Sequence, residues 1–175
     1  MHFDLGEAIE VLERTPGTLA YFLTGLSDGW LLCDEGEGTW NVTQVIEHLI
    51  EGEKTNWIPR LQILLREGEN AVFTPFVRLP SEDSSHDRPI RQKLSEFKAL
   101  RLENIARLKT LIHTDAQLEL TGSHPAFGTV KARELLSTWV VHDFTHLAQI
   151  ARVMAKRYGE DVGPWTAYLG ILKNR

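Results

Sequence analysis

The fold is decided by one uninterrupted stretch, Trp139-Val140-Val141-His142-Asp143-Phe144-Thr145-His146-Leu147-Ala148-Gln149-Ile150. It contains neither glycine nor proline, so it is predicted to lie in the middle of a long helix, where residues three and four apart share a face. One such face, spaced alternately by four and three residues, holds Leu135, Trp139, His142, His146, Gln149 and Val153. This spacing is typical of the core seam of a helix in a bundle. Two histidines and a glutamine therefore occupy positions where apolar side chains are expected.

The polar side chains on this seam need partners, because burying them alone costs roughly a few kcal/mol. A third histidine, His48, lies within a second predicted helix, one turn before Gly52. Three imidazoles on two inner helix faces match a metal site with three histidine ligands and positions open to water or substrate. We therefore predict a metal ion on His48, His142 and His146. The alternative of three core histidines with separate partners stays open, because histidine is often satisfied by a single hydrogen bond.

Two further residues of the same stretch are candidates for a catalytic role. Asp143 follows His142 as the catalytic glutamate follows the first histidine of an HExxH metalloprotease. Its side chain is one methylene shorter and lies about 100° around the helix from His142, so a role in supporting a ligand or in a surface ion pair is equally consistent. Gln149 continues the histidine face. It is predicted either to orient a bound water or substrate or to satisfy backbone groups at the seam.

Three residues near the histidines are candidates for substrate contacts. Gly52 leaves room beside His48 for a ligand to approach, although close helix packing explains this glycine equally well. Trp139 lies one turn before His142 on the same face. His124 precedes a proline in a glycine-flanked loop that must pass near the start of the fourth helix, and a turn-forming role is its simpler interpretation.

The composition predicts a single domain, residues 1–175, with neither nucleic-acid nor membrane partners. A net charge of −5, with no basic run longer than Lys156-Arg157, argues against nucleic-acid binding, which depends on clustered basic side chains. The sequence has no apolar run of about eighteen residues and no basic and apolar leader. The single cysteine, Cys33, can form no internal disulfide. A cytoplasmic protein with histidine or carboxylate metal ligands is therefore expected.

Helical periodicity recurs along the rest of the chain and predicts an all-α four-helix bundle. Its helices are expected at Leu5–Leu26, Asn41–Leu65, Ile90–Ile112 and Thr129–Tyr158, followed by a short C-terminal helix at Pro164–Leu172. Two prolines mark irregularities in the first two helices. Thr15-Pro16 predicts a kink or a fresh helix start, and Pro59 predicts a bend.

The connections between these helices differ in length. Ser27–Thr39 is rich in glycine and acidic residues and reads as a loop. Gly68–Pro89 is long for a turn between neighbouring helices, so it is predicted to cross along the length of the bundle, between the second and third helices. Thr114–Gly128 forms another, shorter connection.

Four segments of the chain resemble the DinB-like superfamily of bacterial helical-bundle proteins. These segments are Trp40–Leu49, His124–Gly128, His142–Ile150 and Gly163–Trp165. The resemblance implies a four-helix bundle with a long crossover after the second helix. It also implies one divalent metal ion per chain, commonly zinc or nickel, on His48, His142 and His146.

The same resemblance implies a function, because members of this superfamily include thiol-dependent S-transferases, metal-dependent hydrolases and proteins without a known activity. We therefore expect a metal-dependent enzyme that activates a thiol or water for transfer to a small electrophilic substrate. A low-molecular-weight thiol would be the cosubstrate, a preference that rests on the resemblance alone. Hydrolysis and a non-catalytic, metal-stabilised binding bundle are the alternatives. A homodimer through exposed helix faces is compatible with the sequence, but no residue pattern fixes it.

Overall fold

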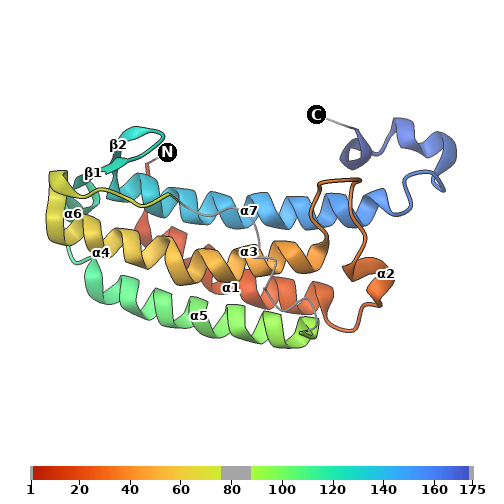
Figure 1. The fold of residues 1–175 in the computed structure, drawn as a ribbon, viewed down its shortest axis with the longest axis horizontal. Helices are drawn as coiled ribbons and strands as arrows, with labels where there is room; N and C mark the ends of the chain where they lie inside the picture. Colours follow the sequence, from red (N-terminus) through yellow and green to blue (C-terminus); the bar gives the residue numbers. More distant parts are fainter. Residues whose placement is uncertain (1, 76–87, 174–175) are drawn as a thin grey trace.

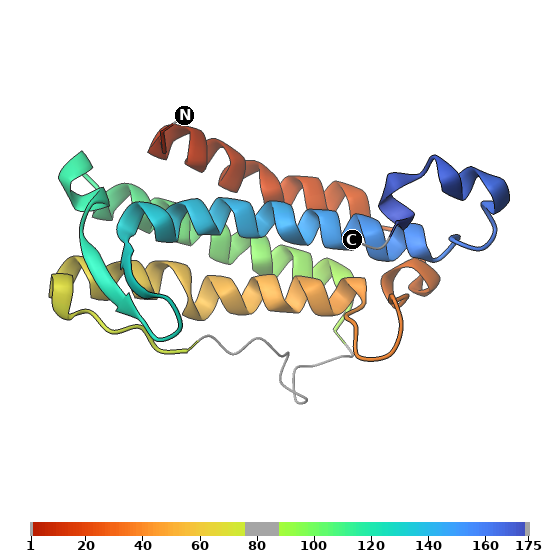
Figure 2. The same cartoon turned by 90° about the horizontal axis from the view of Figure 1, so that it is seen from above.

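The computed structural model describes residues 2–75 and 88–173 and consists mainly of four long helical segments, one of which is divided into two helices (Figure 1). Their bounds are Leu5–Leu23 for α1, Val42–Thr55 and Trp57–Glu67 for the consecutive pair α3 and α4, Ile90–Leu111 for α5, and Ala132–Lys156 for α7. Seen from above, α7 lies between α1 and the α3–α4 pair (Figure 2), and α5 packs against both α1 and α3. The predicted all-α bundle is confirmed.

The core consists of two hydrophobic clusters, which follow one another along the bundle. Trp57 and Trp139 belong to one cluster. Ile46 and Ile150 belong to the other. Because α7 contributes Trp139 to the first and Ile150 to the second, the segment of α7 that carries the two histidines lies between them.

Helix α1 continues through Pro16, which excludes a fresh helix start, one of the two alternatives predicted at this proline. Asp4 caps the helix, accepting a hydrogen bond from the Glu7 N–H at 2.9 Å. Pro16 has no N–H and leaves the Leu12 carbonyl without its helical donor. The buried Arg101 guanidinium supplies that donor, with 3.0 Å between its Nη1 atom and the Leu12 oxygen. This partner from another helix satisfies the carbonyl and is compatible with a proline inside the helix.

The second predicted helix is interrupted at Asn56, which divides it into α3 and α4. Asn41 and Gln44 form a capping box at its start. Pro59 cannot donate to the carbonyl of Thr55, and its ring would clash with that carbonyl in a continuous helix. The interruption therefore falls one turn before the proline and places Pro59 in the first turn of α4.

A β-hairpin precedes α7 and was not predicted. Its strands are β1, Thr121–His124, and β2, Gly128–Lys131, which pair antiparallel. Residues 129–131, expected to open the fourth helix, therefore belong to a strand, and α7 begins at residue 132. Val72, after the end of α4, forms a bridge to Ser123. Such short strands depend on this long-range pairing, which local sequence patterns do not encode.

The remaining elements are short. They are α2 at Asp28–Leu31, α6 at Asp115–Leu118, and the 3₁₀ turns η1 at Gly68–Asn70, η2 at Gly163–Ala167 and η3 at Gly170–Leu172. Two 3₁₀ turns thus replace the predicted C-terminal α-helix, with hydrogen bonds such as Tyr168 N–H to the Trp165 carbonyl at 2.9 Å. Residues 76–87 of the predicted crossover lie outside the described part of the chain. Across residues 2–75 and 88–173, no helix combines the length and apolar character needed to cross a membrane.

Candidate metal centre

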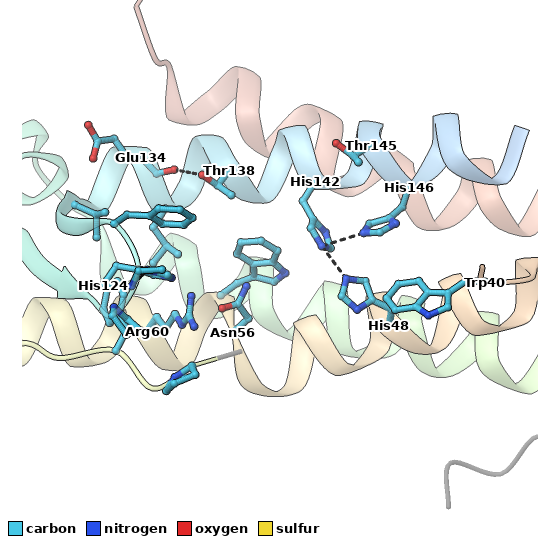
Figure 3. A pocket seen from close by; sticks show the side chains of 18 residues that line it. Trp40, His48, Asn56, Arg60, His124, Glu134, Thr138, His142, Thr145 and His146 are labelled. Atoms are coloured by element: carbon cyan, nitrogen blue, oxygen red, sulfur yellow. Dashed lines mark hydrogen bonds between the residues drawn. The ribbon is translucent and has the colours of Figure 1, made fainter. Parts of the chain in front are cut away.

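Three histidine side chains from two helices converge in the bundle (Figure 3). His48 belongs to α3, and His142 and His146 lie one turn apart on α7. The Nε2 atom of His142 lies 3.1 Å from the Nε2 atom of His48 and 3.1 Å from that of His146. Nitrogen ligands at about 2.0–2.1 Å from a tetrahedral zinc ion are about 3.3 Å from one another. The spacing of these nitrogens therefore fits a shared metal ion.

Gln149 fixes the orientation of one of these rings. The Nδ1 atom of His146 donates to Oε1 of Gln149 at 2.7 Å, which leaves the lone pair on Nε2, facing the other two histidines. Metal-binding histidines are commonly held in this way through their second ring nitrogen. Gln149 therefore has a role that was not predicted from the sequence, as the support of a histidine ring.

Burial favours the neutral form of the two histidines on α7. Burial first, then the neighbouring His146, His48 and Arg101, lowers the pKa of His142 to about 3. Burial also lowers the pKa of His146. Neutral imidazole is the form that binds a metal, so both side chains are available as ligands at neutral pH. The Nδ1 atom of His142 is buried and has no hydrogen-bond partner among residues 2–75 and 88–173.

Two tryptophans that were not predicted as site residues pack against the histidine rings. Trp40 lies against His48, with ring centroids 4.8 Å apart, and Trp57 meets His142 edge-on at 5.1 Å. Gly52 makes room for Trp57, because a Cβ atom at residue 52 would lie 3.3 Å from the Trp57 Nε1 atom. The glycine thus serves close packing around the site. An aromatic residue in an apolar position has the same sequence pattern as a core residue, so no sequence signal identified Trp57.

Asp143 belongs to a buried ion network on another face of α7. Its carboxylate accepts two hydrogen bonds from Arg101 of α5, at 2.6 and 2.9 Å. Arg101 also donates to Glu53 of α3 at 3.0 and 2.9 Å, and Glu53 accepts a hydrogen bond from the Trp139 indole at 2.9 Å. Asp143, Arg101 and Trp139 are all 0% exposed. Asp143 is therefore a buried ion-pair partner, and Trp139 has no surface with which to contact a substrate.

A cavity of about 800 Å³ opens beside the three histidines. Its apolar wall includes Trp40, Trp57, Phe73, Pro75, Phe127, Val130 and Leu135. His124 also lines it, at the end of β1, with its ring stacked on Phe127 at a centroid distance of 4.5 Å. In the part of the chain that the structure describes, the other candidate residues, Gly52, Trp139, Asp143 and Gln149, do not line this cavity. Its size is typical of a site for a small organic molecule.

The fold and the site together define a class: a four-helix bundle whose inner faces present three histidines to one metal-sized space, beside a small-molecule cavity. The sequence pattern of the DinB superfamily matches residues 11–150, and the chain belongs to this superfamily. The family resemblance carried by the histidine segments is therefore confirmed.

Two curated relatives carry names that state metal dependence. A protein of Oceanobacillus iheyensis named "Putative metal-dependent hydrolase" is 29% identical over 154 residues, which cover 87% of each chain. YfiT of Bacillus subtilis, which carries the same description, is 29% identical over 154 residues, covering 86% of this chain and 84% of YfiT.

A solved structure of YfiT from Bacillus subtilis has the same fold. It is described as "a probable metal-dependent hydrolase with an unusual four-helix bundle topology". The superposition has a TM-score of 0.75, covers 93% of this chain and 91% of that chain, and aligns residues that are 24% identical. At this identity the likeness establishes the arrangement of the helices.

Proposed function

We propose that His48, His142 and His146 hold one divalent metal ion, zinc or nickel, and that the chain is a metal-dependent enzyme acting on a small organic substrate. The observation that carries this proposal is the convergence of three histidine nitrogens beside a cavity of about 800 Å³. A metal ion bound there would lower the pKa of a coordinated thiol or water and so supply a nucleophile at neutral pH. We propose thiol transfer to an electrophile as the reaction, with a low-molecular-weight thiol as cosubstrate.

The protein's own side chains prepare this site. Gln149 holds the His146 ring through its Nδ1 atom at 2.7 Å, so that Nε2 faces inward. Burial lowers the pKa of His142 and of His146, so neither has to lose a proton before it binds a metal at neutral pH. The Trp40 ring packs against His48 and the Trp57 ring against His142.

The cavity is large enough for a reaction between two organic molecules. A water molecule occupies about 30 Å³, whereas the cavity measures about 800 Å³ and is lined mainly by apolar atoms. This space accommodates a thiol and an electrophile together. Hydrolysis is the second candidate, because the relatives from Oceanobacillus iheyensis and Bacillus subtilis are named metal-dependent hydrolases.

Elemental analysis of untagged protein tests the metal site. We expect about one zinc or nickel ion per chain in the wild type and in His113→Ala, which replaces an exposed histidine. His142→Ala should lose the metal while keeping the helical circular dichroism spectrum. Metal absent from the wild type after incubation with zinc and with nickel, or retained undiminished in His142→Ala, would refute the site.

Turnover of small electrophiles, with and without an added thiol, separates the two reactions. Thiol transfer predicts a thioether product that requires both the thiol and the metal. Hydrolysis predicts a product that forms without thiol and incorporates oxygen from labelled water. Turnover that persists at the same rate after the metal is removed would contradict both candidates. A metal-loaded protein that converts no electrophile under either condition would point to the non-catalytic binding bundle.

A further inference from the structure

Arg60 of α4 is a buried cation that borders the same cavity as the three histidines. Its residue exposure is only 7%. The Nη2 atom donates to the Thr74 carbonyl at 2.7 Å, and the guanidinium carbon lies 5.3 Å from the centre of the Phe73 ring. A guanidinium has five N–H donors, so this hydrogen bond uses one of them. The others are available to a molecule in the cavity.

Arg60 differs from the other buried cations of the described chain in having no carboxylate partner. Lys93 is paired with Glu47 at 2.7 Å, and Arg101 is paired with Glu53 and Asp143. Among residues 2–75 and 88–173, no carboxylate lies within ion-pair distance of Arg60. Burying an unpaired cation costs free energy, and here burial lowers the pKa of the guanidinium. A ligand with a negative charge would offset that cost.

His124 adds a second donor at this end of the cavity. Its Nδ1 atom accepts a hydrogen bond from the Ala126 N–H at 3.1 Å, so the proton of the neutral ring is on Nε2. Burial, followed by the nearby charge of Arg60, lowers the pKa of His124 and favours this neutral form. Glu134 also lines the cavity, but it is exposed and accepts a hydrogen bond from the Lys131 N–H at 2.8 Å. Of the charged side chains that line the cavity, Arg60 is the one whose charge acts on His124.

We propose that Arg60 and His124 bind the carboxylate of the substrate, whose apolar body extends through the cavity toward the three histidines. Figure 3 shows Arg60 and His124 at one end of the cavity and the histidine cluster at the other. One cation beside a neutral histidine balances a single negative charge, and the planar guanidinium fork matches a carboxylate. This inference rests on the proposed function, because it names the substrate class of that site as small organic acids with an apolar body.

Isothermal titration calorimetry with 4-phenylbutyrate and its uncharged amide, 4-phenylbutyramide, tests the carboxylate subsite. The full chain is titrated as purified and again after chelation of metal. We expect the acid to bind at least about tenfold more tightly than the amide in both preparations, because hydrogen bonds to a charged partner are the stronger ones. Arg60→Gln should remove this preference, and Arg60→Lys should keep part of it. Arg66→Gln, on the exposed face of the same helix, is the matched control and should keep it fully.

The outcomes separate this inference from the proposed function. Equal binding of acid and amide by the wild type, no binding of the acid, or a preference that survives in Arg60→Gln would overturn the subsite. None of these results bears on whether the three histidines bind metal. Conversely, a preference that depends on Arg60 and persists after chelation supports the subsite even if no turnover is found. If Arg60→Gln loses its helical circular dichroism, Arg60→Lys is compared with the wild type and with Arg66→Gln instead. An unchanged preference for the acid over the amide in Arg60→Lys would also count against a bidentate guanidinium contact.

Discussion

Replacing Asp143 by asparagine should destabilise the protein without removing its metal. In the native structure the Asp143 carboxylate accepts hydrogen bonds from Arg101 at 2.6 and 2.9 Å, and both side chains are 0% exposed. Two unit charges about 4 Å apart at an effective dielectric constant of about 20 attract each other by about 4 kcal/mol. The amide keeps one acceptor, and Glu53 still neutralises Arg101. We therefore expect a loss of about 2–4 kcal/mol in the free energy of unfolding.

Thermal and urea unfolding of chelated protein at pH 7 measure this loss for Asp143→Asn. For a chain of this length, about 3 kcal/mol corresponds to a decrease of about 6–12 °C in Tm. Asp161→Asn makes the same chemical change at an exposed position and should leave Tm within about 1–2 °C of the wild type. A loss below about 1 kcal/mol for Asp143→Asn would refute the stabilising ion pair. Loss of the metal with unchanged stability would instead place Asp143 at the metal.

Three further predictions concern the histidine cluster and a second buried ion pair. Below about pH 6.5 the metal-free protein should lose up to about 1.4 kcal/mol per pH unit through His142, because the unfolded chain binds a proton there while the folded chain, with a pKa of about 3, does not. Urea unfolding from pH 7 to 4 should show a shallower decline for His142→Gln, and an equal decline would contradict this assignment. Gln149→Leu should weaken metal binding about 10–100-fold in chelator competition, whereas Gln149→Glu, which keeps an acceptor for His146, should bind metal nearly as tightly as the wild type. Equal metal affinities of Gln149→Leu and the wild type would show that the contact is dispensable. Lys93→Met should lower the free energy of unfolding by about 3–5 kcal/mol, because it leaves Glu47 buried without a cation. Adding Glu47→Leu should restore most of that loss, and a double variant no more stable than Lys93→Met would contradict the pairing.

The long helices could be predicted from the sequence because their signals are local. Apolar spacing, the caps at Asp4 and Asn41, and the absence of glycine and proline from the middle of α7 all act within a few turns. The course of the chain at Pro16 could not be predicted in the same way, since its missing hydrogen bond is compensated by Arg101, 89 residues from Leu12 along the chain. The hairpin at 121–131 was missed for a related reason. Its strands are four residues long and pair with each other and, at Ser123, with Val72.

The three histidines could be selected from the sequence because their helical spacing places polar groups on an apolar seam. The structure brings them together, with the His142 Nε2 atom 3.1 Å from those of His48 and His146, while metal binding itself stays a prediction. The partners of Asp143 were not predictable, because the apolar spacing of α5 does not reveal which of its charged residues face the core. Lys93, Arg101 and Asn104 are in fact buried among apolar neighbours of that helix. Arg60 was missed in the same way, as a single cation within an apolar stripe.

The buried network matters to the site because it fixes the helices that carry the histidines. One guanidinium, that of Arg101 on α5, contacts the Leu12 carbonyl of α1, Glu53 of α3 and Asp143 of α7. Asp143 directly follows His142, so the ion pair restricts the rotation of α7 about its own axis. Glu53 restrains α3, the helix of His48. Metal ligands must keep their positions within a few tenths of an ångström, and side chains on packed helices achieve this better than side chains on loops. The cluster of Asp143, Arg101 and Glu53 does not line the cavity, but it therefore contributes to the geometry of the three histidine nitrogens.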